Sequence, residues 1–382
     1  MLKRLCMLLV MVILLSMFTA CAGGEQPFDL AERETDISPD LTFERSMPLD
    51  YATEFAVDYY DGGYALITVS TQDRYLVIPE GLSAPAGLPE DIVPLFQPLD
   101  NIYIAASAVM DMFVTIDALD SVRFSALQAS SWYVQPAREA MEAGEILFAG
   151  KHSTPDYEQI LTEGCGLAVE NTMIYHNPEV KEQLEKFGIP VLIDYSSYED
   201  NPLGRTEWVK LYGLLTGHED EAEAAFAAEQ AAFEAISKAE ATGKTVAFFY
   251  INVNGEVNVR STTDYIPKMI EMAGGKYIFE DLGAKDETAS TITMQMEDFY
   301  AQAKDADYII YNSTIDGELN DLAELNAKSP LLEKFRAVQQ GNVFCTTKNL
   351  YQETMELGTF ISDINRLLSG ETDGMTYIYK LE

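Results

Sequence analysis

The amino-acid sequence predicts an α/β protein made of two Rossmann-like α/β lobes joined by a rigid helical connector. Three observations support this fold class. Short apolar runs alternate with helical patterns in both halves of the chain, as in parallel sheets covered by helices. Residues 203–240, between these halves, contain no strand-like run. A chain of 382 residues with 47% hydrophobic composition also exceeds what one core normally holds.

The first twenty residues have the pattern of an export signal. A basic start precedes the apolar run 5–18, which is too short to span a bilayer comfortably but suits a signal-peptide core. Cys21 follows two small residues, an arrangement that resembles the bacterial lipoprotein cleavage box. We therefore expect residues 1–20 to be a lipoprotein signal peptide, Cys21 to carry the lipid, and residues 21–42 to form an acidic flexible tether. The alternative is an ordinary secretory signal in which Cys21 is incidental.

Residues 43–202 have the pattern of an N-terminal α/β lobe. The runs "YALITV" and "RYLVIP" predict an opening pair of strands. Further strands are expected at "NIYIAAS", "SVRFSA", "EILFAG", "GLAVEN" and "IPVLIDY". The helical patterns between them are "AVMDMFVTIDAL", "VQPAREAMEAG", "PDYEQILTEG" and "NPEVKEQLEKFG". This alternation predicts a parallel sheet with helices on both of its faces.

The helical connector is expected at residues 203–240 and a C-terminal α/β lobe at residues 241–382. In the connector, "PLGRTEWVKLYGLLTG" has apolar residues at helical spacing and ends at Gly217, and an Ala- and Glu-rich helix follows. Such a connector limits how far two lobes can swing. In the second lobe, strands are expected at "TVAFFYINVN", "EVNVRS", "KYIFE", "DYIIYNS" and "NVFCTT". Helices are expected at "DYIPKMIEMAGG", "SPLLEKFRAVQQG" and from about Tyr351 to Leu368.

Composition excludes several function classes. A formal net charge of -37 at pH 7 would repel nucleic acid and anionic lipid headgroups. Outside the signal and the lipid site only Cys165 and Cys345 remain, and both are interpreted as small buried residues, with their redox state left open. Three histidines are too few to favour a receptor for a naked metal ion. No nucleophile elbow, phosphate-binding loop or zinc-protease motif is present, so we do not expect an enzyme.

Ligands of parallel sheets gather outside the carboxyl ends of the strands, so residues after each predicted strand are candidate ligand contacts. The candidates that we single out are Trp132, Tyr133, His152, Tyr175, Tyr195, Arg260, Tyr265 and Lys348. The aromatic side chains would stack on a planar or macrocyclic ligand, and Arg260 would take a carboxylate or catecholate oxygen. His152 could ligate a haem or cobalamin metal, although a hydrogen-bonding role fits a lone histidine better. Core packing is the alternative for each aromatic residue, and Arg205 is interpreted as a structural link between connector and lobe.

A unit of helix, turn and strand occurs twice in the chain. It reads "PDYEQILTEGCGLAVEN" at residues 155–171 and "MQMEDFYAQAKDADYIIYN" at residues 294–312. Each copy has a glutamate near the start of its helix, Glu158 in the first and Glu297 in the second. Glutamates on helices usually belong to a solvated face, so the repeat alone assigns these two no role.

Three segments carry a resemblance to a known family: "SSYEDNPLGRTEWVKLYGLLTGHEDEAEAAF", "TMIYHNPEVKEQLEKFGIPVLI" and "GKHSTPDYEQIL". They resemble the helical-backbone (class III) substrate-binding lipoproteins of ABC transporters, the group that receives iron-siderophore, haem and cobalamin ligands. The resemblance extends over residues 40–370. It implies two similar lobes that face each other across a cleft, with one acidic side chain on each lobe that pairs with arginines of a permease subunit. Carried over by motif, these acidic residues are Glu158 and Glu297.

The resemblance implies an extracytoplasmic substrate-binding component of an ABC importer, monomeric and lipid-anchored to the outer face of the cytoplasmic membrane. The protein would capture a ferric siderophore or a related metal chelate, without a resident cofactor. It would deliver this ligand to a permease dimer with its ATPase. Two alternatives stay open: a cobalamin or haem receptor of the same fold, and a ligand-sensing surface lipoprotein that is not coupled to transport.

Overall fold

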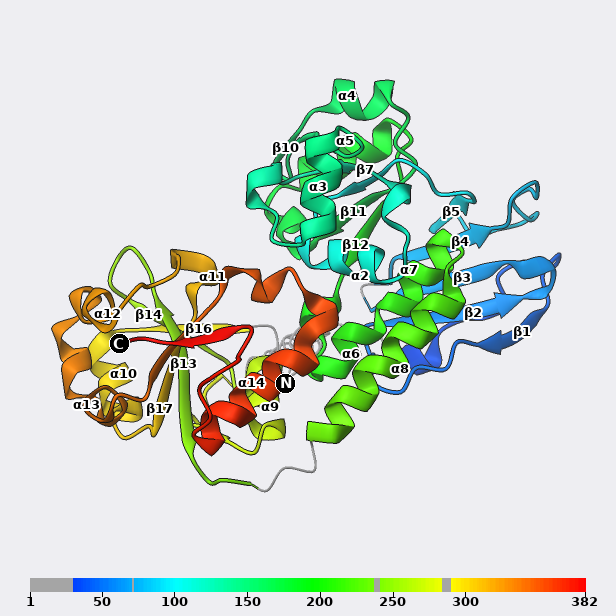
Figure 1. Ribbon diagram of the computed structural model, residues 1–382. Coiled ribbons are helices and arrows are strands. Elements are labelled where there is room, and N and C mark those ends of the chain that lie inside the picture. Colours follow the sequence, from blue (N-terminus) through cyan, green and yellow to red (C-terminus); the bar gives the residue numbers. More distant parts are fainter. Residues whose placement is uncertain (1–29, 71, 237–240, 284–289) are drawn as a thin grey trace, which may run out of the picture.

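The computed structural model describes residues 30–70, 72–236, 241–283 and 290–382. The expected signal peptide, Cys21 and the first part of the expected tether lie outside these ranges. Two α/β lobes occupy the top and the lower left of Figure 1, and a third sheet lies at the right. A group of helices runs between this third sheet and the lower lobe. Among the described residues, no helix is both long enough and apolar enough to cross a membrane.

The third sheet is built by the first strands of the chain, in the order β1–β2–β3–β4–β5. The strands are β1 (Phe43–Ser46), β2 (Phe55–Tyr60), β3 (Ala65–Val69), β4 (Arg74–Ile78) and β5 (Ile92–Phe96). The predicted opening pair is present as the antiparallel strands β3 and β4. A single N-terminal lobe over residues 43–202 was expected, whereas these five strands form a sheet separate from that of the lobe.

Residues 30–42, expected to belong to the flexible tether, pack against this sheet instead. Ile37 is 3% exposed and belongs to a small apolar cluster with Tyr60 and Leu76. Arg33 Nη2 lies 2.6 Å from Asp58 Oδ1, and that carboxylate is buried. The structure therefore corrects the tether prediction for this part, because a buried apolar side chain and a buried ion pair fasten the segment to the sheet.

The N-terminal lobe contains the predicted parallel sheet, in the order β12–β11–β6–β7–β8. Its strands are β6 (Ile102–Ile104), β7 (Val122–Ser125), β8 (Leu147–Phe148), β11 (Ala168–Asn171) and β12 (Val191–Asp194). The helices are α2 (Met110–Thr115), α3 (Gln135–Ala143), α4 (Tyr157–Thr162) and α5 (Pro178–Lys186). A short hairpin, β9 (Gly150–Lys151) and β10 (Thr154–Pro155), precedes α4. Strands and helices alternate as the sequence predicts.

The C-terminal lobe has a seven-stranded sheet in the order β16–β14–β13–β17–β18–β19, with β15 beside β13. The strands are β13 (Thr245–Ile251), β14 (Val257–Arg260), β15 (Lys276–Tyr277), β16 (Thr291–Met294), β17 (Tyr308–Tyr311), β18 (Val343–Thr346) and β19 (Ile378–Lys380). The helices are α9 (Tyr265–Met272), α10 (Met296–Ala303), α11 (Ser313–Asp316), α12 (Leu322–Lys328), α13 (Arg336–Gln340) and α14 (Leu357–Ser369). Strands β14, β16 and β19 run antiparallel to their neighbours, so this sheet is mixed.

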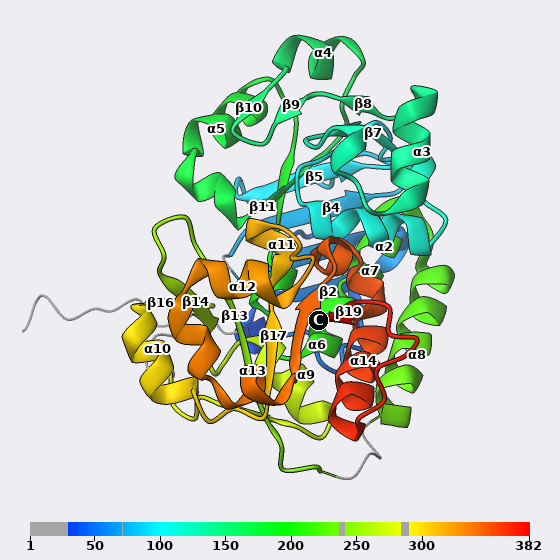
Figure 2. The same ribbon diagram turned by 60° about the vertical axis from the view of Figure 1, so that its left-hand side comes forward.

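The helices between the two lobes are α6 (Pro202–Glu207), α7 (Val209–Thr216) and α8 (Glu219–Ile236). Helix α7 is buried on all sides, and Gly213 lets α8 approach closely, since a Cβ at this glycine would lie 2.5 Å from the Cβ of Ala222. Helix α14 of the C-terminal lobe packs along α8, as Figure 2 shows. The predicted rigid helical connector is therefore present, because tightly packed helices, and not a flexible linker, lie between the lobes.

Two buried carboxylates fasten this helical group to the segment between β1 and β2. The carboxylate of Glu207 accepts hydrogen bonds from the backbone N–H groups of Asp50, Tyr51 and Ala52, the shortest at 2.8 Å. Glu199 accepts from the N–H groups of residues 53 and 54 and from the indole of Trp208. Both glutamates are at most 2% exposed. We call this arrangement the carboxylate clamp.

The clamp gives a stability prediction. Glu207→Ala leaves three backbone N–H groups without their acceptor and removes one of the partners of the buried Lys210, so we expect a loss of about 3 kcal/mol or more in the free energy of unfolding. Glu223→Ala removes a 64% exposed partner of Lys210, which keeps Glu207 and the carbonyl of Pro48, and should cost less than about 1 kcal/mol. Urea unfolding of both variants measures the difference, and equal losses would contradict the clamp.

Glu170 on β11 is another buried acid, and unlike Glu199 and Glu207 it accepts no hydrogen bond. Its side chain is 0% exposed, and neither carboxylate oxygen has a hydrogen-bond partner. Burial raises the pKa of Glu170 to about 8, because the charged form loses its hydration without compensation. The strand that carries it ends beside the cavity described below.

A pH prediction follows from Glu170. Because its folded pKa lies above the unfolded value of 4.5, the folded state keeps a proton that the unfolded state releases, and stability falls as pH rises from about 4.5 to about 8. The fall contributed by this group is at most about 1.4 kcal/mol per pH unit. Glu170→Gln should remove this contribution and be more stable than the wild type at about pH 8. The exposed Glu182→Gln is the control, and identical pH profiles for all three proteins would refute the assignment.

Candidate functional site

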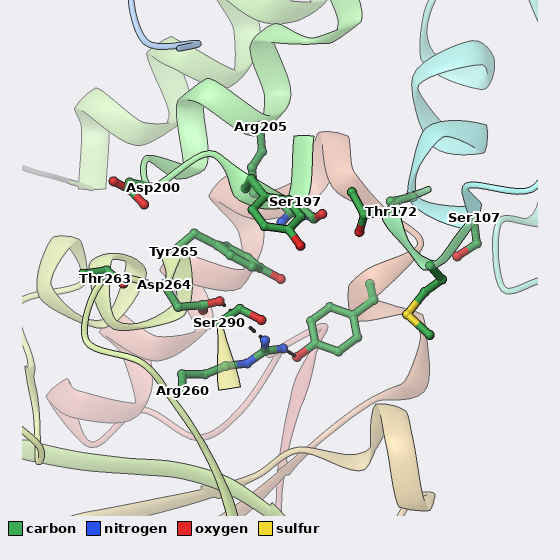
Figure 3. Close-up of a pocket in the computed structure, with 14 residues that line it drawn as sticks. Ser107, Thr172, Ser197, Asp200, Arg205, Arg260, Thr263, Asp264, Tyr265 and Ser290 are labelled. Carbon is green, nitrogen blue, oxygen red and sulfur yellow. Dashed lines mark hydrogen bonds and ion pairs between the residues drawn. The ribbon is translucent and has the colours of Figure 1, made fainter. Parts of the chain in front are cut away.

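A cavity of about 400 Å³ lies between the two lobes. Its walls come from the N-terminal lobe, from α6 and from the C-terminal lobe, and Figure 3 shows how their side chains converge. The lining residues are Ser107, Ala108, Thr172, Met173, Ser197, Tyr198, Asp200, Arg205, Arg260, Thr263, Asp264, Tyr265, Ser290 and Tyr351. A ligand here would touch both lobes and the helical connector at once.

Capped turns at the ends of strands position several of these residues. Asn171 ends β11, and its side-chain oxygen accepts a hydrogen bond from the backbone N–H of Met173 (2.8 Å). Asp264 lies shortly after β14 and accepts from the N–H of Ile266 in the first turn of α9 (2.9 Å). Such caps satisfy the first N–H groups of a helical turn, so the chain can leave the strand abruptly. Met173 and Tyr265, next to the caps, therefore line the cavity.

Arg260 is the central cation of the C-terminal wall. Its Nη1 lies 3.4 Å from Asp264 Oδ2, and its Nη2 donates to the hydroxyl of Tyr351. Asn312 also donates to that hydroxyl (3.1 Å), which fixes the Tyr351 ring. Burial by itself lowers the pKa of Arg260, but the neighbouring Tyr351 and Asp264 outweigh it and raise the pKa, so the guanidinium stays charged. Burial raises the pKa of Asp264, and Arg260 opposes that shift.

Arg205 lines the cavity, although the sequence analysis interpreted it as a structural link between connector and lobe. It lies on α6, is 5% exposed and lines the cavity, with its guanidinium carbon 4.0 Å from the ring centroid of Tyr265. Figure 3 shows its side chain descending from α6 toward that ring. The sequence placed Arg205 only in a helical connector. Two features of the sequence could have pointed to Arg205 as a cavity residue. It lies eleven residues after the end of β12, and the chain has only 25 basic residues.

The N-terminal wall has one aromatic lining residue, Tyr198, which belongs to a cluster of tyrosines beside the cavity. Met173 and Tyr198 line the cavity, and the ring of Tyr198 lies 5.2 Å from that of Tyr195. Tyr195 in turn donates its hydroxyl hydrogen to the hydroxyl of Tyr175 (2.8 Å). Met173, Tyr175 and Tyr198 are each more than 40% exposed. Exposed large apolar side chains that gather beside a cavity mark a binding surface more often than a core.

The structure brings some of the predicted contacts to the cavity. Arg260 and Tyr265 line it, and Tyr175 and Tyr195 lie in the aromatic cluster next to it. Tyr133 is 40% exposed but does not line the cavity, and its backbone N–H donates to Gln352 of the other lobe (2.7 Å). The positions of Arg260, Tyr265, Tyr175 and Tyr195 are compatible with ligand contact. That these four residues touch a ligand stays a prediction.

Trp132, His152 and Lys348 lie elsewhere. The structure corrects the prediction for Trp132, which is 0% exposed and packed in the core, where its indole N–H donates to Ser125 Oγ (2.9 Å). His152 lies in the turn between β9 and β10, and Lys348 in the helical turn after β18; neither lines the cavity. Within the described ranges, no three His, Cys, Asp or Glu side chains are close enough to hold a metal ion.

The two glutamates of the repeat occupy equivalent places. Glu158 is the second residue of α4 and Glu297 the second residue of α10, and both are exposed. Helix α4 lies at the far end of the N-terminal lobe and α10 at the outer side of the C-terminal lobe in Figure 1. Each lobe therefore presents one such carboxylate.

A larger cavity, of about 710 Å³, lies at the other end of the N-terminal lobe. It is bounded by β5 and by residues that precede strands, namely Asn101 before β6, Gly166 before β11 and Pro190 before β12. Its walls are mainly apolar and come from only one side of the molecule. We favour the cavity between the lobes as the functional site, because charged, aromatic and hydroxyl groups converge there from three units.

Comparison with known proteins agrees with this geometry. The model of the periplasmic binding protein family matches residues 107–350. An uncharacterized lipoprotein of Methanocaldococcus jannaschii is 25% identical over 336 residues, which cover 84% of this chain and 79% of that protein.

Two solved structures show the same fold at low sequence identity. The periplasmic haem-binding protein HutB of Vibrio cholerae has a TM-score of 0.57 at 16% identity, over 69% of this chain and 98% of HutB. The siderophore-binding protein FhuD of Vibrio cholerae, bound to Fe3+-Desferal, has a TM-score of 0.52 at 14% identity, over 70% of this chain and 99% of FhuD. Since the family model matches more than half of its length, the chain belongs to the periplasmic binding protein family.

Proposed function

We propose that the protein is the extracytoplasmic substrate-binding component of an ABC importer, and that it captures a ferric siderophore or a related metal chelate. The observation that carries the proposal is the cavity between the lobes, which Arg205 and Arg260 line together with Tyr198, Tyr265 and Tyr351. Family membership supports a binding role, and similar folds include a haem-binding and a siderophore-binding protein.

The two sides of the cavity suit the two parts of such a ligand. A planar guanidinium such as that of Arg260 can donate two hydrogen bonds to carboxylate, catecholate or hydroxamate oxygens. The rings of Tyr198 and Tyr195, with Met173, offer apolar and stacking contact to the flat or organic part of a chelate. No bond needs to be broken, so the function is binding and release.

Lobe movement would be small. Gln352 of the C-terminal lobe donates to the carbonyl of Ser131 (2.9 Å) and accepts from the N–H of Tyr133, both in the N-terminal lobe. Asp111 on α2 accepts from the N–H of Met355 across the same boundary (2.8 Å). With the packed connector, these contacts favour modest closure around a ligand over a wide hinge motion.

Delivery would use the exposed glutamates of the repeat. Glu158 on one lobe and Glu297 on the other would each pair with arginines of one subunit of a two-fold permease. Exposed ion pairs contribute only about 0 to 1 kcal/mol each, so their role would be register and orientation. A lipid on Cys21 would hold the protein at the outer face of the cytoplasmic membrane, close to the permease.

The binding step is tested on the purified mature chain. We expect native mass spectrometry and absorbance titration to detect a complex with at least one of a panel of ferric siderophores, haem and cobalamin, with a dissociation constant below about 10 μM. The panel also distinguishes a siderophore receptor from a haem or cobalamin receptor. If no member of the panel binds at this level, the proposal is wrong.

The delivery step is tested with Glu158→Arg and Glu297→Arg combined. Charge reversal should leave chelate binding unchanged and abolish uptake of radiolabelled chelate by cells that carry the cognate permease, because arginine then faces arginine. Glu182→Arg and Glu333→Arg, which reverse one exposed charge on each lobe, are the matched controls and should transport normally. Normal uptake by the first variant would remove these two glutamates from docking.

A further inference from the structure

We infer that Arg205 of the connector helix α6 is a ligand contact, and that it selects cargo with anionic oxygens at the edge of the chelate. This inference rests on the proposed function of the cleft and deepens it by naming the charge class of the ligand. It also assigns to the connector a direct part in recognition, where the sequence suggested only a structural one.

The first argument is that the Arg205 guanidinium has no hydrogen-bond or ion-pair partner among the described residues. It is 5% exposed, yet it makes no hydrogen bond or ion pair to another described residue, and its buried Nε is unsatisfied. Arg33 shows the usual arrangement, with its Nε and Nη2 both donating to Asp58. Buried charges are costly unless they are paired and hydrogen-bonded. A guanidinium with open donors beside a cavity is therefore prepared for an acceptor that enters from the cavity.

The second argument concerns the nearby carboxylates. Asp194 already accepts from the hydroxyls of Tyr212 and Ser196, each at 2.6 Å. Asp264 already accepts from the N–H of Ile266 and lies against Arg260. Burial raises the pKa of both acids and Arg205 is close enough to oppose that shift, but both carboxylates are engaged by these other donors. Asp194 and Asp264 thus reduce the cost of burying the positive charge of Arg205, and they leave the N–H donors of its guanidinium available to a ligand.

The third argument is that Arg205 is held in place before a ligand arrives. Its guanidinium lies against the ring of Tyr265, and the carboxylate clamp anchors α6 through Glu207, two residues further along. Arg205 and Arg260 line the same cavity from different units. Since a fixed planar guanidinium loses little entropy on binding, it recognises paired oxygens well. In a chain of net charge -37, an anionic ligand needs such a local cationic site to overcome the general repulsion.

The test compares two iron(III) complexes of similar size: a tricatecholate complex, which is triply negative, and a trihydroxamate complex, which is uncharged. Citrate without iron is a third probe, which does not depend on chelate transport. The proteins are the wild type, Arg205→Gln, Arg205→Lys and the matched control Arg45→Gln. Arg45 lies over the ring of Tyr59 at 3.8 Å, much as Arg205 lies over Tyr265, but on the exposed strand β1. Dissociation constants are measured by calorimetry and midpoints of unfolding (Tm) by thermal scanning.

We expect the wild type to prefer the anionic complex. Arg205→Gln should weaken binding of that complex by roughly tenfold to a hundredfold, while binding of the uncharged complex changes by less than about twofold. Arg205→Lys should retain part of the preference, and Arg45→Gln all of it. Because Arg205→Gln removes an unpaired buried charge, the Tm of the ligand-free variant should stay the same or rise.

Two results would overturn the inference: no preference of the wild type for the anionic complex, or the same affinity of Arg205→Gln for it. Unchanged anion binding together with a lowered ligand-free Tm would mean that Arg205 only anchors α6. If the wild type binds neither complex, citrate tests the inference alone, because the proposed function is decided by the full panel of ferric siderophores, haem and cobalamin. A citrate-induced rise in Tm that Arg205→Gln lacks would support it, and the absence of any rise in the wild type would refute it.

Discussion

The carboxylate clamp is the interaction on which the rest of the structure depends. Glu199 precedes the segment "NPLGRTE" and Glu207 is its last residue, and together they accept hydrogen bonds from the backbone N–H groups of residues 50–54 in a buried setting. Charge-assisted hydrogen bonds of this kind are roughly twice as strong as neutral ones. They fix α6, and α6 in turn carries one wall of the cavity. The motif that looks like a family signature thus has a structural role at its glutamates and, by our inference, a ligand-binding role at its arginine.

This arrangement explains how a strongly acidic protein can offer a binding site to a chelate with anionic oxygens. The net charge is set by exposed acids, whose effect solvent and salt screen within about 10 Å. Inside the cavity, Arg205 and Arg260 act in a less polar medium and beside Asp194 and Asp264, which offset the cost of burying positive charge. Local geometry, and not the overall charge, then determines what binds.

The sequence predicted those features that depend on local patterns. The alternation of apolar runs with helical patterns predicted the parallel sheet of the N-terminal lobe. The stretch without strand-like runs predicted the helices α6 to α8. Of the sheet β1–β5 only β3 and β4 were predicted, and the antiparallel strands β16 and β19 were not, because their pairing depends on contacts between distant segments. Ile37 and Arg33 looked like tether residues, since nothing in their neighbourhood reveals Tyr60 or Asp58.

The site could be predicted only in part, for a similar reason. Arg260 and Tyr265 follow a strand, and this rule brought them to the cavity correctly. The same rule misplaced Trp132, because a residue after a strand can turn back into the core when a hydroxyl such as that of Ser125 satisfies its indole. The rule that ligand contacts follow the ends of strands did not apply to Arg205, because Arg205 lies on the helix α6.

The central claim is that one ligand contacts both lobes and the connector in the cavity between them. Hydrogen–deuterium exchange of the protein with and without a bound iron chelate tests it most directly. The account predicts slower exchange at once in residues 107–109, 172–174 and 263–266, with little change in β1–β5. Protection confined to one lobe, or to the groove between β5 and the amino ends of β6, β11 and β12, would contradict the account.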